Sequence, residues 1–306
     1  MDPFCQEEGN DMENLAQFKV DEERCVGCGL CVKACPAMLI VVNEKKKAQI
    51  KEVKRMDWYG CWGCQHCLCV CPQGAISVLG KHPEDSLPMA DRGAAVVMDE
   101  LIAGRKSCRH FQDRNVEKEL LDHMLRILEN APTGGNKQRT EYTLIDDKEE
   151  MKKFQKLVYD KMEALAQQGI YPKTFDAESY QIMKDRQEQA MNGDLLFCSA
   201  PHLFIPHSPL ALGSCREDVT IAASYFELMC AARQLGAVIL RFPLNVLNNM
   251  PEVKALLKIP EDHYVGAAIG FGYPEFSYAR GSQKAGKAKI HRLTFQPATE
   301  RMPEGQ

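Results

Sequence analysis

The chain has 306 residues, of which 45% are hydrophobic, so it is long enough and apolar enough for two ordinary domains. Charged residues make up 26% of the chain and the formal net charge is −4, so no basic excess points to nucleic acid as a partner. Residues 1–18 are acidic where a signal peptide would be basic and then apolar, and no apolar run reaches the length that a bilayer requires. We therefore expect a cytoplasmic protein that binds neither nucleic acid nor membrane.

The cysteines are concentrated near the N-terminus. Nine of the fourteen lie between Cys25 and Cys71, and the other five are scattered. Because the cytosol keeps thiols reduced, such a concentration indicates metal binding rather than a disulfide framework. The cysteines form two copies of the pattern C-x2-C-x2-C-x3-C-P, CVGCGLCVKACP at residues 25–36 and CWGCQHCLCVCP at residues 61–72.

The spacing of these runs predicts two iron-sulfur clusters. Three thiolates on a tight loop can reach three irons of one cubane, whereas the fourth cysteine of each run ligates the other cluster. We therefore assign two ligand sets, Cys25, Cys28, Cys31 and Cys71 to one [4Fe-4S] cluster, and Cys61, Cys64, Cys67 and Cys35 to the second. Zinc is the alternative, but it closes its tetrahedron with two separated pairs rather than with triplets followed by C-P. Residues 18–79 resemble the bacterial-type two-[4Fe-4S] ferredoxins.

The flanks of the two runs repeat as well. LIVV at residues 39–42 and AISVL at residues 75–79 each follow a C-P, as a short strand and its pseudo-symmetric copy would. Gly27 and Gly63 occupy equivalent positions, where we expect the backbone to pass close to the clusters.

Three residues of this region are left with more than one interpretation. Cys69 breaks the symmetry of the runs, and we expect a small buried packing residue there rather than an alternative iron ligand. Trp58 and Trp62 flank the second run and either shield its cluster, face a partner domain or fill the core.

The rest of the chain predicts a linker and a second domain. GKHPEDSLP at residues 80–88 is rich in Pro, Gly and charge, as domain linkers are. We expect four parts in chain order: an acidic tail (1–17), a ferredoxin domain (18–79), a linker (80–94) and a larger domain (95–306).

The larger domain begins with a basic cluster and an amphipathic helix. Residues 98–112 have an apolar helical face that leads into Arg105, Lys106, Ser107 and Arg109. Such a cluster suits a bound phosphate, but for the cluster taken alone the favoured interpretation is a helix C-terminus with cations that satisfy the dipole. A predicted helix at residues 115–132 places five residues on one face, Val116, Leu120, Met124, Ile127 and Leu128.

The order of these motifs resembles the nitroreductase family of flavin-dependent oxidoreductases. The resemblance rests on four features in this order: R-x-S-x-R-x-F, the amphipathic helix, APTGGNKQ at residues 131–138 and the strand EYTLI at residues 141–145. Residues 218–237 are similar to the long central helix of that family, and residues 257–280 to its late I-P, strand, G-Y-P segment. The resemblance implies an α+β fold with a central, mainly antiparallel sheet flanked by helices.

The resemblance also implies a cofactor and an assembly. Arg105, Lys106, Ser107 and Arg109 match the stretch that holds the phosphate, the ribityl chain and the N1 edge of FMN. Thr133, Asn136 and Gln138 match a segment that completes the flavin site from the other subunit of an interlocked homodimer, and Arg280 matches a second phosphate contact. No side chain is assigned as a catalytic acid or base.

Several positions depart from the family pattern or remain open. Arg139-Thr140 follows the N-x-Q motif where Pro-Trp is frequent, and AVILRFP at residues 237–243 replaces a loop with a small residue. Arg241 in that segment either orients an anionic substrate or lies on the rim. His202 and His207 either line the pocket or are hydrogen-bonded histidines of the core, and we expect the second.

Both halves together predict a ferredoxin–nitroreductase fusion. We expect an external low-potential donor, such as another ferredoxin, to reduce FMN through the two clusters. The flavin then reduces a small electron-poor acceptor such as a nitroaromatic, a quinone or an activated alkene. One alternative is direct reduction by NAD(P)H with electron export through the clusters, and another is a non-enzymatic relay or redox sensor.

Overall fold

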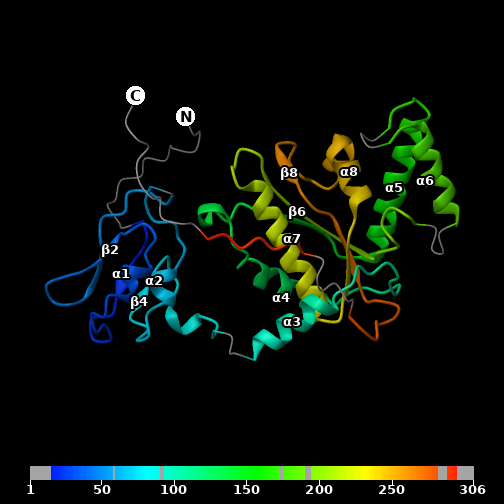
Figure 1. Cartoon of the computed structure of the whole chain (residues 1–306). Helices are drawn as coiled ribbons and strands as arrows, with labels where there is room; N and C mark the ends of the chain where they lie inside the picture. The colour runs from blue at the N-terminus through cyan, green and yellow to red at the C-terminus, as the bar shows by residue number, and fades with distance from the viewer. Residues whose placement is uncertain are drawn as a thin grey trace, which may run out of the picture.

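The structure is a computed structural model that describes residues 15–57, 59–89, 93–171, 175–189, 194–281 and 288–294. The cysteine-rich part folds into a small unit of two strand pairs and two short helices (Figure 1). Its elements are β1 (Lys19–Val20), α1 (Leu30–Ala34), β2 (Ile40–Val42), β3 (Ala48–Ile50), α2 (His66–Cys69) and β4 (Ile76–Ser77). β1 pairs with β4 and β2 pairs with β3, both antiparallel. The strands predicted after each C-P are therefore confirmed, although the second is only two residues long.

The two halves of this unit share their backbone geometry. Gly27 and Gly63 have φ angles of 67° and 62°, in the left-handed region that glycine tolerates best. A Cβ at Gly27 would lie 2.1 Å from the carbonyl oxygen of Lys46, so a side chain has no room there. The residues that precede the two helices, Gly29 and Gln65, are left-handed too. Each helix is thus entered through the same tight turn.

The connection to the second unit contains a short 3-10 turn, η1 (Pro83–Asp85), and the helix α3 (Ala94–Gly104). No residue of α3 is buried, and its apolar side chains Val96, Val97, Met98 and Ile102 are exposed. After Gly104 the chain continues as an extended segment, in which Ser107 forms a parallel bridge with Ala237. An apolar helix face therefore lies uncovered beside the basic segment.

The second unit is built on an antiparallel sheet. Its strands are β5 (Glu141–Ile145), β6 (His202–Pro209), β7 (Gly236–Ile239), β8 (His263–Val265) and β9 (Ile269–Gly272). The order is β5-β6-β9-β7, and β8 also pairs with β6. Every one of these pairs is antiparallel, which confirms the predicted fold class.

Helices cover both faces of this sheet (Figure 1). They are α4 (Lys118–Leu128), the 3-10 turn η2 (Gly134–Asn136), α5 (Lys148–Ala166), α6 (Ala177–Gln189), α7 (Cys215–Ala232), α8 (Arg241–Asn249) and α9 (Pro251–Leu256). Successive residues of β6 point to opposite faces, as a strand requires. Phe204 packs with α4 and α7, where its ring stacks on Phe226 at 3.9 Å. Leu203 and Ile205 pack with α5, α8 and α9.

Two helices differ from their predictions at the ends. The helix predicted at residues 115–132 spans Lys118–Leu128 and buries Leu121, whereas Leu120 and Ile127 are only partly buried. The helix predicted at residues 218–237 starts at Cys215 and ends at Ala232, and Gly236 already begins β7. A Cβ at Gly236 would lie 2.6 Å from the sulfur of Cys108, so the close passage of the basic segment explains this glycine.

The predicted domain limits at residues 17, 79 and 94 stay predictions. Among the described residues, none of the helices has both the length and the apolar character that crossing a membrane would require.

Candidate functional site

The eight predicted iron ligands surround two separate hollows in the small unit. One hollow, of about 360 Å³, is lined by Cys25, Cys28, Cys31 and Cys71. The other, of about 420 Å³, is lined by Cys35, Cys61, Cys64 and Cys67. Each hollow therefore combines the first three cysteines of one run with the last cysteine of the other. Ligation of iron by these sulfurs stays a prediction.

Backbone N–H groups donate to the sulfurs of Cys25, Cys35 and Cys71, the first from Ala48 at 3.5 Å. The N–H of Leu39 donates to Cys35 Sγ at 3.4 Å, and the N–H of Ala75 donates to Cys71 Sγ at 3.3 Å. Donor and sulfur are four residues apart in both cases, so the pseudo-symmetry extends to the hydrogen bonds. Such bonds stabilise negative charge on sulfur, and iron-sulfur sites use them to adjust the reduction potential. The polar environment therefore fits thiolate ligands.

The thiols themselves need a cationic partner to ionise. Burial raises the pKa of Cys31 and Cys61, and it raises that of Cys67 to about 12. Neighbouring cysteines of the same hollow add to each shift, because like charges repel. The protein alone thus favours neutral thiols, and metal binding must release their protons.

The two remaining residues of the second run lie in different surroundings. Cys69 is exposed on α2, so the prediction of a buried packing residue is wrong. The buried position of that single-turn helix is taken by Leu68 instead. Trp62 is half-buried and lines the second hollow, and Trp58 lies outside the described residues.

The segment of residues 105–109 is placed against the C-terminal half of α7. Arg105 Nε lies 3.1 Å from a carboxylate oxygen of Glu227, a partner that the sequence did not suggest. Lys106 Nζ lies 2.9 Å from the carbonyl of Gly104, at the end of α3, which is the alternative role of a cation at a helix C-terminus. Arg109 is exposed. Contacts of these side chains with FMN stay predictions.

Arg280 lies near the segment of residues 105–109. Its side chain is exposed, and a Cβ at the following Gly281 would lie 3.1 Å from the carbonyl oxygen of Ala103 in the last turn of α3. The structure therefore brings Arg280 close to the start of the basic segment.

The segment of residues 133–138 is held at the N-terminal end of α7. The N–H of Gly134 donates to Asp218 Oδ1 at 2.9 Å, and the hydroxyl of Ser214 donates to the other oxygen of this buried carboxylate at 3.0 Å. A Cβ at Gly134 would lie 2.1 Å from that hydroxyl oxygen. Asp218 is therefore a positioning residue, which sequence reasoning missed because 84 residues separate it from Gly134.

The three predicted flavin residues of this segment hydrogen-bond to one another. The N–H of Gln138 donates to Thr133 Oγ1, and Gln138 Nε2 donates to Asn136 Oδ1 at 3.2 Å. Asn136 and Gln138 have φ angles of 55° and 51°. Left-handed conformations in residues other than glycine are unfavourable, and they accumulate at functional sites.

The segment also contacts the ferredoxin-like unit. Asn136 Nδ2 donates to the carbonyl oxygen of Trp62 at 3.0 Å. The nearest described neighbours of a Cβ at Gly63 include Asn136 Nδ2, at 4.0 Å. Trp62 and Gly63 both line the second cysteine hollow, so this hollow and the predicted flavin segment are neighbours.

Within one chain, the described residues of the two predicted halves of the flavin site are anchored on α7 at Glu227 and Asp218, nine residues apart. This corresponds to about 14 Å along the helix axis.

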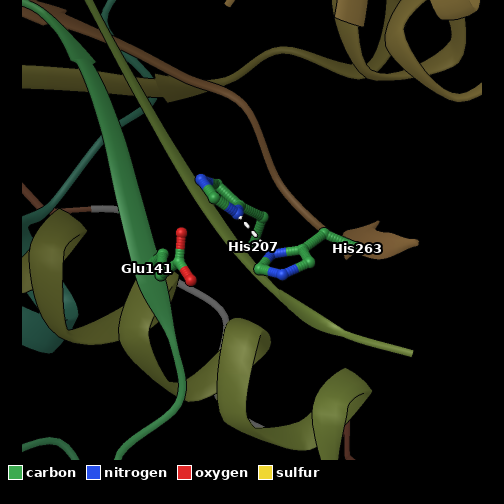
Figure 2. Close-up of side chains that lie close together, drawn as sticks. All are labelled: Glu141, His207 and His263. Carbon is green, nitrogen blue, oxygen red and sulfur yellow. Dashed lines mark hydrogen bonds between the residues drawn. The ribbon is translucent and has the colours of Figure 1, made fainter. Parts of the chain in front are cut away.

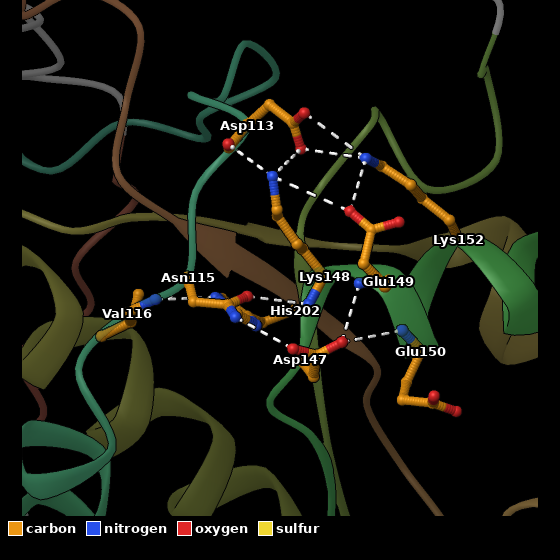
Figure 3. A network of polar contacts seen from close by, with 9 residues as sticks. All are labelled: Asp113, Asn115, Val116, Asp147, Lys148, Glu149, Glu150, Lys152 and His202. Carbon is orange, nitrogen blue, oxygen red and sulfur yellow. Dashed lines mark hydrogen bonds and ion pairs between the residues drawn. The ribbon is translucent and has the colours of Figure 1, made fainter.

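The remaining predicted positions lie in regular structure. Residues 237–243 are not a loop, because they form the end of β7 and the start of α8, where Arg241 is exposed. His202 is fully buried and its Nε2 accepts the N–H of Val116 at 3.0 Å, beside the polar contacts that join residues 113–116 to the start of α5 (Figure 3). It is a hydrogen-bonded core histidine, as expected. Burial lowers the pKa of His202 to about 4.

Comparisons with known proteins agree with both halves of the chain. Residues 18–75 match the model of the 4Fe-4S dicluster domain. The indolepyruvate oxidoreductase subunit IorA of Pyrococcus horikoshii is 47% identical over 61 residues, which are 19% of this chain and 8% of that protein. A ferredoxin of Pyrobaculum islandicum is 35% identical over 69 residues, which are 22% of this chain and 59% of the ferredoxin. The chain thus spans only part of the length of these relatives.

The larger unit matches a second family over more than half of the chain. A nitroreductase with bound FMN from Bacteroides fragilis has a TM-score of 0.50 and 17% identity, and the match covers 66% of this chain and all of that one. The model of the nitroreductase family matches residues 102–273. FMN is the cofactor of the nitroreductase part and two [4Fe-4S] clusters are the cofactors of the dicluster part, as predicted. The chain belongs to the nitroreductase family and carries a 4Fe-4S dicluster ferredoxin domain in front of it.

Proposed function

We propose that the chain is a ferredoxin-linked flavin reductase. An external low-potential donor reduces the clusters, and these supply electrons to FMN, which reduces a small electron-poor organic acceptor such as a nitroaromatic, a quinone or an activated alkene. The observation that carries this proposal is the hydrogen bond from Asn136 Nδ2 to the carbonyl oxygen of Trp62. It joins the predicted flavin segment to the wall of a cysteine hollow.

This contact selects one of the two clusters as the donor to the flavin. Trp62 and Gly63 belong to the hollow lined by Cys35, Cys61, Cys64 and Cys67. We therefore assign the exit of electrons to the cluster of this hollow.

The flavin site is proposed to form between two copies of the chain. Within one chain the segments of residues 105–109 and 133–138 are anchored at different ends of α7. The family resemblance implies that a second subunit completes the site, and the uncovered apolar face of α3 supports a second copy because it lies next to the basic segment. In such a homodimer, the clusters of one chain serve the flavin whose phosphate is held by residues 105–109 of the other.

The side chains of each site then have distinct tasks. Arg105 and Arg280 would bind the FMN phosphate, and the carboxylate of Glu227 orients the Arg105 guanidinium. The exposed cation of Arg109 would stabilise negative charge at the N1 edge of the ring, as the resemblance implies. FMN itself supplies the chemistry of hydride or electron transfer.

The order of reduction tests the direction of electron flow. Protein that holds both clusters and FMN is mixed without air with a reduced ferredoxin or with NADH, and flavin and cluster absorbance are followed separately. The proposal expects the clusters to be reduced before the flavin, and by the ferredoxin only. Flavin bleaching before the clusters with NADH would favour electron export, and lack of turnover with every acceptor would leave a relay or sensor.

A substitution at Asn136 tests the route. Asn136→Leu removes the amide that donates to Trp62 while it keeps the size of the side chain. We expect cluster-to-flavin transfer to slow roughly tenfold or more, because the distance between the cofactors is no longer fixed. Lys137→Leu, at the exposed neighbouring position, is the matched control. Bound FMN is measured in both variants, and an unchanged transfer rate in Asn136→Leu at full FMN content would show that electrons use another route.

A further inference from the structure

Three side chains from three strands converge at one end of the sheet (Figure 2). Glu141 on β5 is the register partner of His207 on β6, so the two side chains share a face. His263 on β8 is the partner of Pro209, two residues after His207, and therefore points to the same face. Ile205 precedes His207 on this face and packs in the core with α5, α8 and α9.

The donor atoms of the three side chains are close to one another. His207 Nδ1 and His263 Nδ1 are 2.8 Å apart, and one donor atom from each of the three residues lies within 4.8 Å of the other two. Both histidines are buried, with 2% and 7% of their surface exposed. Glu141 is exposed, so the carboxylate is on the solvent side of the cluster. Among the residues that the structure describes, the Glu141 carboxylate has no hydrogen bond or ion pair.

The hydrogen bonds around His207 are compatible with a lone pair on Nδ1. His207 Nε2 is 3.1 Å from Thr143 Oγ1, and this hydroxyl can donate to the carbonyl oxygen of Leu257 at 3.5 Å. In the tautomer in which Nε2–H donates to Thr143 Oγ1, the lone pair of His207 is on Nδ1, which faces His263. This is the arrangement of a metal-bound imidazole, whose second nitrogen donates to a neighbouring oxygen.

We propose that Glu141, His207 and His263 bind one zinc ion. Two imidazole nitrogens and one carboxylate oxygen form a zinc site that keeps its fourth position for water. The two Nδ1 atoms would separate from 2.8 Å to about 3.3 Å, the spacing of two nitrogens in a zinc tetrahedron. In this state the metal replaces the proton that the two rings share.

The charges around the site are compatible with a divalent cation. The Glu141 carboxylate is the negatively charged ligand. The positive charge nearby is that of Lys254, whose Nζ donates to the carbonyl oxygen of His263 at 2.7 Å. That ammonium also donates to the carbonyl of Glu261, so its protons are directed at backbone oxygens. The site thus resembles the zinc centres in which one carboxylate and two imidazoles balance part of the ion's charge.

The position of the site suggests what the ion does. Glu141 begins β5 and stands three residues after Gln138, the last residue of the predicted flavin segment. A bridge from β5 to β6 and β8 therefore fixes the point at which this segment enters the sheet.

The test uses the complete protein with its iron-sulfur clusters in place and zinc sulfate as the probe. The zinc content is measured after equilibration and desalting, and the zinc X-ray absorption edge reports the ligands. Bound zinc with nitrogen and oxygen neighbours at about 2.0–2.1 Å is expected, whereas zinc at cluster cysteines would show sulfur at about 2.3 Å.

Two variants and one control complete the experiment. Glu141→Gln removes the carboxylate charge at an exposed position, so its folding should not be impaired, and His263→Gln removes one imidazole. We expect each to weaken zinc binding roughly tenfold or more. His123→Gln, an exposed histidine of α4, should bind zinc like the unmodified chain. Zinc bound only through sulfur, no zinc retained, or equal zinc affinity in Glu141→Gln would overturn the proposal.

Discussion

The buried histidine at the start of β6 predicts a measurable dependence of stability on pH. His202 Nε2 accepts the N–H of Val116, so this nitrogen must be unprotonated in the folded chain. Burial lowers the pKa of His202 to about 4, although the nearby Asp146 and Asp147 raise it in part. The fold therefore favours the neutral imidazole. His202→Gln replaces it by a side chain that can still accept a hydrogen bond but does not titrate.

The magnitude follows from the two pKa values of His202. An unfolded histidine has a pKa of about 6.5, and the folded value of about 4 lies below it. The stabilisation is therefore complete above about pH 6.5 and is lost as the pH falls towards 4. From about pH 7 to about pH 5 the loss amounts to about 2 kcal/mol, or a factor of about 30 in the opening equilibrium.

Hydrogen exchange measured by mass spectrometry can detect this loss locally. The chain has two units and several cofactors, so a single unfolding transition cannot be assumed. Peptides that contain Val116 and β6 should lose about 30-fold more protection between pH 7 and pH 5 in the unmodified chain than in His202→Gln, after correction for intrinsic rates. His123→Gln, at an exposed position of α4, is the control and should behave like the unmodified chain. Equal losses in His202→Gln and the unmodified chain would refute the reasoning.

Two further substitutions test the flavin segment and the cluster ligands. In Gly134→Ala the new methyl group would overlap the hydroxyl of Ser214, so the bond to the α7 carboxylate should break and FMN affinity should fall about tenfold to a hundredfold. Gly213→Ala, where a Cβ meets nothing within 4 Å, should retain FMN in the same dialysis assay, and equal retention by both would contradict this view of the segment. Cys69→Ala should keep about eight irons per chain, whereas Cys67→Ala should lose about four, as iron analysis would show. Loss of iron from Cys69→Ala would instead make this exposed thiol a ligand.

The features that the sequence predicted well depend on short spacings. Each cysteine run spans eleven residues, and the structure places the first three cysteines of one run and the last cysteine of the other around each hollow, as predicted. The strand at residues 141–145 was predicted with its observed limits, because EYTLI follows the N-x-Q motif as a strand does in the family that the sequence resembles. Local periodicity also indicated α4, but not which side chains it buries. The buried face of α4 consists of Leu121, Met124 and Leu128, at spacings of three and four residues, and Leu120 is only partly buried beside it.

Features that depend on distant residues were not accessible from the sequence. The partner of Arg105 is Glu227, and the acceptor for Gly134 is Asp218, both on a helix more than eighty residues away. Asp218 lies among ordinary polar residues at the start of α7, and only the fold shows that its carboxylate is buried. The cluster formed by Glu141, His207 and His263 depends on strand register in the same way. A one-residue shift would move His207 to the other face of the sheet.

The covalent link explains how a weak contact between the two units can suffice. The hydrogen bond from Asn136 to the Trp62 carbonyl is by itself worth about 1 kcal/mol net, far too little to hold two separate proteins together. Joined in one chain, the two units meet at an effective concentration of roughly millimolar, so a weak contact is populated without a large interface. A weak contact also leaves the ferredoxin-like unit free to separate. Under the proposed function, an external donor would then reach the clusters without competing against a tightly packed flavin domain, and the fusion would supply electrons to the flavin without a long-lived complex.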